Sequence, residues 1–182
     1  MANNCYNHIF MYGFKNKSDI DKITNWLKSY DKFDYIRDWV KSILDNTEKP
    51  SKDFDYGGRW FDFDFDADVD SVQIFGDSAW IPMLGMCELL SKEFEITIDI
   101  KFEEPGINFG GSYMYKNGYE GIIFYGTYNQ YLYYYKGING ILDELDYFAG
   151  DKEAIEGILD DISNNLSNHD KKILNEYISL ID

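Results

Sequence analysis

Residues 59–70 read RWFDFDFDADVD, and from Phe61 to Asp70 hydrophobic and polar positions alternate strictly. A period of two predicts a β-strand, in which successive side chains lie on opposite faces. One face of this strand would bury phenyl rings, and the other would display a row of carboxylates. The carboxylates are those of Asp62, Asp64, Asp66, Asp68 and Asp70. Because like charges on one face repel each other, burial of the aromatic face must hold the strand in place.

Similar patterns predict further strands along the first three quarters of the chain. Asn117 and Gly118 have the composition of a hairpin turn. The predicted strands are residues 5–14, 71–75, a strand from Ile96 that ends at Pro105 and Gly106, 110–116, 119–126 and Tyr128–Tyr135. The last of these contains many tyrosines, and its rings would point to both faces of the strand.

Hydrophobic residues at helical spacing predict helices in three places before residue 95 and again in the tail. The first helix would begin at a cap formed by Ser18, and the others would cover residues 36–44 and 84–94. From Ile138 to the end the spacing is helical, with a turn around Asn168, and this part has 11 acidic and three basic residues. We therefore expect a domain of residues 1–137 and an acidic helical extension, residues 138–182, packed on it.

The net charge of −16 is distributed unevenly. Residues 1–52 contain nine Lys and Arg against seven Asp and Glu, whereas residues 53–182 contain eight against 26. Phosphate binding needs clustered Lys and Arg, so direct nucleic-acid binding by the second range is disfavoured. A basic protein surface is the better-matched partner, because a negative field speeds encounter with a positive surface.

Cysteine content and hydropathy bear on the compartment. The two cysteines, Cys5 and Cys87, are too few for a disulfide framework, which is typical of a reducing compartment. No apolar run approaches the roughly 20 residues that span a bilayer, and the first ten residues do not have the pattern of a signal peptide. We therefore expect a cytoplasmic protein that does not bind membranes.

The spacing of Asp66, Asp68 and Asp70 matches part of a calcium loop, with Asp77 at the twelfth position. Ser71, however, stands where the sharp turn of such a loop needs glycine. A solvated acidic face is therefore the favoured interpretation, and no metal or other cofactor is expected. Calcium binding is kept as an alternative.

No pattern of a catalytic nucleophile is present. His8 falls in a predicted strand and His169 in a polar turn, and neither has a serine or cysteine in a recognisable elbow nearby. The glycines at 106, 110 and 111 do not form a phosphate loop. We expect no enzyme and assign no catalytic residue, although a carboxylate pair leaves a small hydrolase open.

Tyrosines are concentrated between residues 113 and 135. In the predicted strand Tyr128–Tyr135, one face would be core and the other would expose amphipathic rings of the kind that anchor protein interfaces. Ordinary strand packing with wet hydroxyl groups is the alternative. The candidate partner-binding tyrosines are Tyr131, Tyr133, Tyr134 and Tyr135.

Several short motifs occur in a fixed order over roughly residues 1–126. They are Asn3, Cys5, Asn7, Trp60, Ser78-Ala79-Trp80 with Pro82, Glu104-Pro105-Gly106 and Phe109-Gly110-Gly111. Together they resemble the YubB-like ferredoxin-like proteins of phages and plasmids. This resemblance implies an α+β fold with an antiparallel sheet and helices on one face, encoded on a mobile genetic element, and it implies no established chemistry. Small size and strong acidity are also similar to those of phage anti-CRISPR proteins.

These observations favour a binding protein over an enzyme. The expected function is inhibition of a host nucleic-acid-binding defence factor in the bacterial cytoplasm, with a CRISPR effector nuclease as the candidate target. The acidic residues would occupy a surface meant for phosphate, and the tyrosines would act as anchors. A non-enzymatic phage or plasmid accessory protein is the alternative, and the chain would be a monomer or a homodimer.

Overall fold

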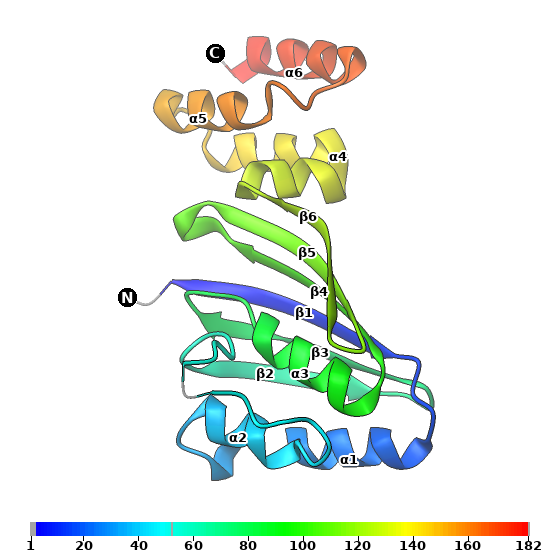
Figure 1. Ribbon diagram of the computed structural model, residues 1–182. Helices are drawn as coiled ribbons and strands as arrows, with labels where there is room; N and C mark the ends of the chain where they lie inside the picture. The colour runs from blue at the N-terminus through cyan, green and yellow to red at the C-terminus, as the bar shows by residue number, and fades with distance from the viewer. Residues whose placement is uncertain (1–2, 52, 182) are drawn as a thin grey trace. The chain divides into compact units, whose positions relative to one another are not determined.

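A computed structural model of the chain describes residues 3–51 and 53–181, and it divides into two compact units. The first unit holds the chain up to residue 107 together with residues 111–124. The second holds residues 108–110 and everything from residue 125 onward. Figure 1 shows the elements of both units in chain order.

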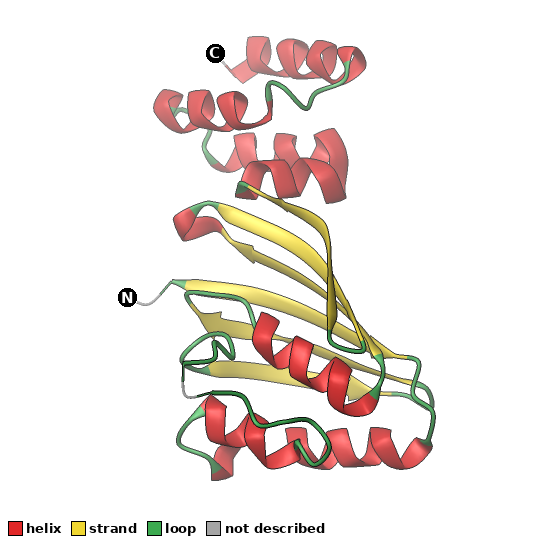
Figure 2. Ribbon diagram, in the orientation of Figure 1, coloured by secondary structure: helices red, strands yellow, loops and turns green. Residues whose placement is uncertain are grey.

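The first unit is an antiparallel six-stranded sheet with helices on one face, so its class is α+β, as the resemblance implied. The strand order is β2-β3-β1-β4-β5-β6, which puts β1 in the middle and β2 at one edge. Figure 2 shows α3 in front of the sheet and α1 and α2 below β2 in this view. The elements are β1 (Asn4–Tyr12), α1 (Lys17–Leu27), η1 (Tyr30–Lys32), α2 (Ile36–Ile43), β2 (Phe61–Ala67), β3 (Ser71–Ala79), α3 (Leu84–Phe94), β4 (Thr97–Glu104), η2 (Pro105–Ile107), β5 (Phe109–Lys116) and β6 (Tyr119–Gly126).

Strand β1 defines the two faces of this sheet. Its alternate residues Cys5, Asn7, Ile9 and Met11 are fully buried on the face that the helices cover. The residues between them are exposed or half-buried, so the opposite face of the sheet is open. Strand β1 pairs antiparallel with both β3 and β4. It is therefore a central strand, and its helix-covered side belongs to the core.

Aromatic rings join β2 to the helices. The indole rings of Trp26 on α1 and Trp39 on α2 stack with their centroids 4.0 Å apart, and each indole N–H donates to the backbone carbonyl of the other residue. Phe63 on β2 stacks on Trp39 at 5.6 Å and meets the edge of the Tyr30 ring at 5.4 Å. Burial of these rings holds the phenylalanine face of β2 in place, as the alternation predicted.

The second unit is built from three helices, α4 (Tyr128–Tyr147), α5 (Lys152–Ile162) and α6 (Asn168–Ile181). They share one apolar core. Its fully buried members are Leu132, Ile141, Leu145, Ile158, Ile162 and Leu174. Asn108 belongs to this unit because its side chain accepts from the backbone N–H of Tyr128 and donates to Asp161.

Strand Tyr128–Tyr135 was wrongly predicted, because these residues form the first turns of α4. Thr127 and Gln130 make a capping box, in which each side chain accepts from the backbone N–H of the other residue. This cap starts a helix that propensity alone would not favour, and Gly137, with φ of 64°, later breaks it.

Two other boundaries differ from the predicted ones. Helix α1 begins at Lys17 with Asn16 as its N-cap, so Ser18 lies in its first turn instead of capping it. Strand β3 continues to Ala79, four residues past the predicted end at Phe75, because Ser78 and Ala79 still pair with β1.

Candidate functional site

An acidic row, which we define as Asp62, Asp64 and Asp66, lies along β2 on the open face of the sheet. All three residues are exposed, whereas Phe61, Phe63 and Phe65 between them turn to the helix-covered side. Successive carboxylates on one face of a strand are about 6.6 Å apart. The alternation predicted this arrangement correctly for β2 itself.

The row is shorter than predicted. Strand β2 ends at Ala67, and Asp68 and Asp70 lie in the turn that leads to β3. Within that turn the Asp68 backbone N–H donates to Ser71, and the Asp68 carboxylate accepts from the N–H of Val69. The last two carboxylates therefore lie beyond the end of β2.

Strand β3 adds a fourth carboxylate to the open face. Asp77 stands directly opposite Asp62 in the register of β2 and β3, so both side chains lie on the same face. Among the residues that the structure describes, no ion pair involves Asp77 or any member of the acidic row. These carboxylates thus form a negatively charged surface on the open face.

Aromatic side chains border the acidic row on the open face. Phe75, opposite Asp64 in the register, stacks on His8 of β1 with ring centroids 4.5 Å apart. His8 Nε2 lies 3.3 Å from Gln73 Oε1 on β3, and Tyr6 further along β1 is 42% exposed. We did not predict this border, although alternation in residues 5–12 put the aromatic residues and His8 on one face.

The four candidate tyrosines lie on α4 in the second unit, not on a strand. Tyr131 is buried, and the Tyr133 hydroxyl donates to Asp170 on α6 over 2.7 Å. Tyr135 contacts both Tyr131 and Tyr134, and Tyr134 is 54% exposed. Helix packing, rather than an exposed strand face, therefore explains most of this cluster.

The acidic residues with calcium-loop spacing are not brought together. In the register of the β2–β3 hairpin, Asp66 is opposite Gln73 and Asp77 is opposite Asp62. Four residues of extended strand separate the two positions, or about 13 Å. No group of three or more His, Cys, Asp or Glu side chains arranged to hold a metal ion occurs in the described part of the chain.

Both cysteines are buried and free. Burial, and then the charge of Glu104, raises the pKa of the Cys5 thiol to about 12. Burial alone raises the pKa of the Cys87 thiol as well. Since the thiolate is the nucleophile, neither residue is activated for covalent chemistry.

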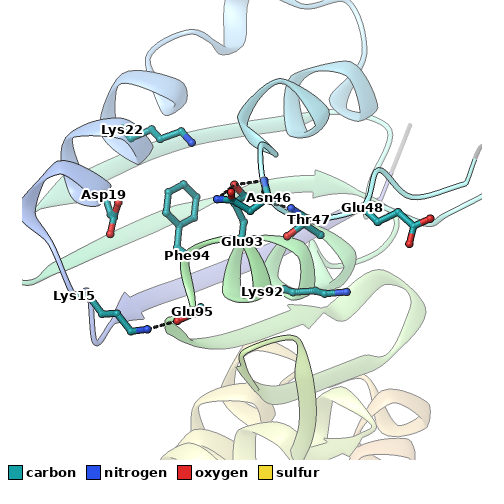
Figure 3. A pocket seen from close by; sticks show the side chains of 10 residues that line it. All are labelled: Lys15, Asp19, Lys22, Asn46, Thr47, Glu48, Lys92, Glu93, Phe94 and Glu95. Atoms are coloured by element: carbon teal, nitrogen blue, oxygen red, sulfur yellow. Dashed lines mark hydrogen bonds and ion pairs between the residues drawn. The ribbon is translucent and has the colours of Figure 1, made fainter.

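A cavity of about 570 Å³ is lined by charged residues of α1, α3 and the segment after α2 (Figure 3). Its central feature is Glu93, which is 7% exposed and accepts from the backbone N–H groups of Asp45, Asn46 and Thr47. Burial raises the pKa of Glu93, but these hydrogen bonds outweigh that effect and hold the pKa below its ordinary value. Converging backbone N–H groups of this kind can bind an anion, and here the carboxylate of Glu93 itself already occupies that position.

Several residues of the motifs quoted above form a buried polar network. The Asn7 amide donates to Ser78 Oγ over 2.9 Å and to the Cys5 carbonyl, and its Oδ1 accepts from the N–H of Met83. The Ser78 hydroxyl in turn donates to the carbonyl of Ile81. These contacts fix the end of β3 against β1 and the start of α3, so these motif residues have a structural role.

Comparison with protein families places part of the chain beside a known domain. The family model described as the ferredoxin-like domain in Api92-like protein matches residues 56–132, a range that begins before β2 and ends in α4. The match agrees with the ferredoxin-like sheet and helices of the first unit. No curated protein and no solved structure matches the chain. No helix in the described residues is both long and apolar enough to cross a membrane.

Proposed function

We propose that this protein is a non-enzymatic inhibitor that covers a basic, phosphate-binding surface of a nucleic-acid-binding protein. The contact would be made by the acidic row together with Asp77. One observation carries the proposal: these carboxylates are aligned on an open sheet face and lack ion pairs to the described residues. Such a row competes with phosphates for Lys and Arg side chains.

The aromatic border supplies the apolar part of the contact. Tyr6 and Phe75 lie beside the carboxylates on the same face, and rings of this kind contribute much of the binding energy in protein interfaces. Arg side chains also stack on aromatic faces while they pair with carboxylates. The partner surface we propose is therefore rich in arginine as well as lysine.

The resemblance to phage and plasmid proteins suggests which partner to test first. An inhibitor from a mobile element would act on a host defence factor, and a CRISPR effector nuclease is our first candidate. The effector holds its nucleic acids in a positively charged channel, which an acidic protein can occupy.

The test compares two variants that lose the same charge. The first replaces Asp62, Asp64 and Asp66 by Asn, and the control replaces the exposed α5 residues Glu153, Glu156 and Asp160 by Gln, Gln and Asn. Guide-loaded effectors are mixed with fluorescent target DNA, and displacement of the DNA by each protein is titrated. Three exposed charge pairs at roughly 0.2–1 kcal/mol each predict a loss of about 3- to 150-fold for the first variant only.

Salt provides the second criterion. Exposed charges are screened over about 8 Å at physiological ionic strength and about 3 Å at 1 M, so inhibition by the wild type should weaken steeply with salt. Equal inhibition by the wild type and the acidic-row variant, or equal loss in both variants, would refute the proposal. Thermal unfolding of each variant is measured to check that the fold is intact.

A further inference from the structure

The outer edge of β2 is the feature that carries a further inference. Strand β2 is the last strand of the sheet and pairs on one side only, with β3. In an antiparallel pair, alternate residues direct their backbone N–H and C=O groups toward the neighbouring strand, and the residues between them direct these groups outward.

The hydrogen bonds at the two ends of β2 show which residues point outward. The Ala79 N–H donates to the Trp60 carbonyl, and the Asp68 N–H donates to the Ser71 carbonyl. Even-numbered residues of β2 therefore face β3, and odd-numbered residues present their backbone groups to the free edge. The Phe61 N–H confirms this, because it points away from β3 and donates to the Tyr30 hydroxyl over 3.0 Å.

The free part of the edge thus begins at Phe63 and includes Phe65. Within the described residues, no hydrogen bond is made to the outward backbone groups of these two residues. A cavity of about 610 Å³ runs along the same segment, and Leu27, Tyr30 and Trp60 contribute apolar walls to it. Phe63 and Phe65 are half-buried at its side.

We propose that this edge binds an extended segment in which basic and apolar residues alternate, by adding it as a further strand beside β2. The proposal rests on the proposed function, because it names how a basic partner would engage the acidic row. Strand addition uses backbone hydrogen bonds for affinity and side-chain positions for specificity.

The register dictates which residues of the segment go where. Residues directly opposite each other in neighbouring strands have side chains on the same face. Residues of the segment that pair with Phe63 and Phe65 therefore face the side of the cavity where Leu27, Tyr30 and Trp60 lie. The residues between them lie beside Asp62, Asp64 and Asp66 and should be Lys or Arg.

A second copy of the chain fits this edge poorly. Two β2 strands paired with each other would put two acidic rows side by side on one face, with carboxylates about 5 Å apart. Charge on an edge strand is a known way to prevent such pairing. A basic segment would instead be attracted to the acidic row. Charge complementarity therefore favours a basic segment over a second copy of the chain at this edge.

The test uses the full chain and the peptide acetyl-Lys-Val-Lys-Val-Lys-Val-Lys-amide in two N-methylated forms. One form is methylated on the valine nitrogens, which would face β2, and its matched control on three lysine nitrogens, which would face solvent. We expect the control to bind at least tenfold more tightly by fluorescence anisotropy. On binding, amide hydrogen exchange at Phe63 and Phe65 should slow.

Each outcome decides the matter. Equal binding of the two forms, binding without protection of Phe63 and Phe65, or no binding of either form overturns strand addition. If the acidic-row variant still loses displacement of DNA in any of these cases, the proposed function stands without strand addition. Protection of Phe63 at high protein concentration without peptide would show that a second copy occupies the edge.

Discussion

Replacement of Glu93 by Gln tests a buried carboxylate of the first unit that accepts from three backbone N–H groups. The two carboxylate oxygens accept from the N–H groups of Asp45, Asn46 and Thr47 at 2.7–3.0 Å, and Oε1 also accepts from the Asn46 amide at 3.2 Å. These donors follow directly after α2 and its C-cap Leu44. The side chain of Glu93 on α3 therefore holds residues 45–47, the segment that follows α2.

The expected loss in unfolding free energy follows from these bonds. A hydrogen bond to a charged group contributes about 1.5–3 kcal/mol, against about 0.5–1.5 kcal/mol for a neutral one, and Gln also turns an N–H₂ group toward a donor. Asp45 and Asn46 are exposed, so water replaces part of what they lose, whereas Thr47 is buried. We expect Glu93→Gln to cost about 2–3 kcal/mol, or a fall in Tm of roughly 10 °C.

The pH dependence has a definite sign. The folded-state pKa of Glu93 is lowered, so the stabilisation is fully present above the unfolded value, which is about 4.3 for Glu. It is lost as the pH falls through the folded pKa, because the protonated carboxyl no longer differs in charge from Gln. The difference in stability between the wild type and the variant should therefore be full at pH 7 and shrink as the pH falls below about 4.3.

Tryptophan fluorescence is the suitable assay, because all four tryptophans, at 26, 39, 60 and 80, belong to the first unit. Glu48→Gln is the control, since Glu48 is an exposed acid that lines the same cavity. Its urea midpoint should stay within the experimental error of the wild type. A Glu93→Gln variant as stable as the Glu48 control, or a difference that does not shrink as the pH falls below about 4, would refute the reasoning.

Two further predictions concern other parts of the chain. Glu104 is 1% exposed and, within the described residues, its Oε1 has no hydrogen-bond partner. Burial raises the pKa of Glu104, although hydrogen bonds from Ile107 and Gly106 act to lower it. The contribution of Glu104 to stability is therefore present at low pH and is lost as the pH rises. Glu104→Gln should therefore raise the urea midpoint at pH 7 but not at pH 4, and a lower midpoint at pH 7 would contradict this. Deletion of residues 151–182 removes the helices that cover Leu145, so we expect lower Tm or aggregation by light scattering, and an unchanged monomer would contradict it.

The sequence predicted the acidic strand well because its signal is local. Alternation of Phe and Asp over seven residues specifies both the strand and the face that each side chain takes, whatever the neighbours are. The turn after Ala67 lacked such a signal, and the period of two continued through Asp68 and Asp70 across it. For that reason the predicted row was two residues too long.

The tyrosine segment failed for the opposite reason. Aromatic residues favour strands on a local scale, and residues 128–135 are rich in them. The capping box at Thr127 and Gln130 and the core around Leu132 decide for a helix instead. The cap could have been found in the sequence as a Thr followed three residues later by Gln, whereas burial of Leu132 against α5 and α6 depends on contacts distant in the chain.

Sequence patterns could not predict that β2 lies at the sheet edge or that Glu93 accepts from three backbone N–H groups. Strand order depends on pairings between residues far apart, and nothing in the alternation distinguishes an edge strand from an inner one. Glu93 lies in a helix pattern where one acid looks like an ordinary surface residue. Only the fold shows that three backbone N–H groups converge on it.

The edge position also explains how the fold tolerates the acidic row. At an inner strand, Asp62, Asp64 and Asp66 would have neighbours on both sides, and each neighbouring carboxylate would add repulsion. At the edge only Asp77 on β3 faces the row, and water or a partner occupies the other side. The fold tolerates the repulsion that remains, because the rings of Phe61 and Phe63 hold the strand from the other face. Asn in place of the three aspartates should therefore leave the Tm unchanged or raise it, and a lower Tm would contradict this account of how the fold tolerates the row.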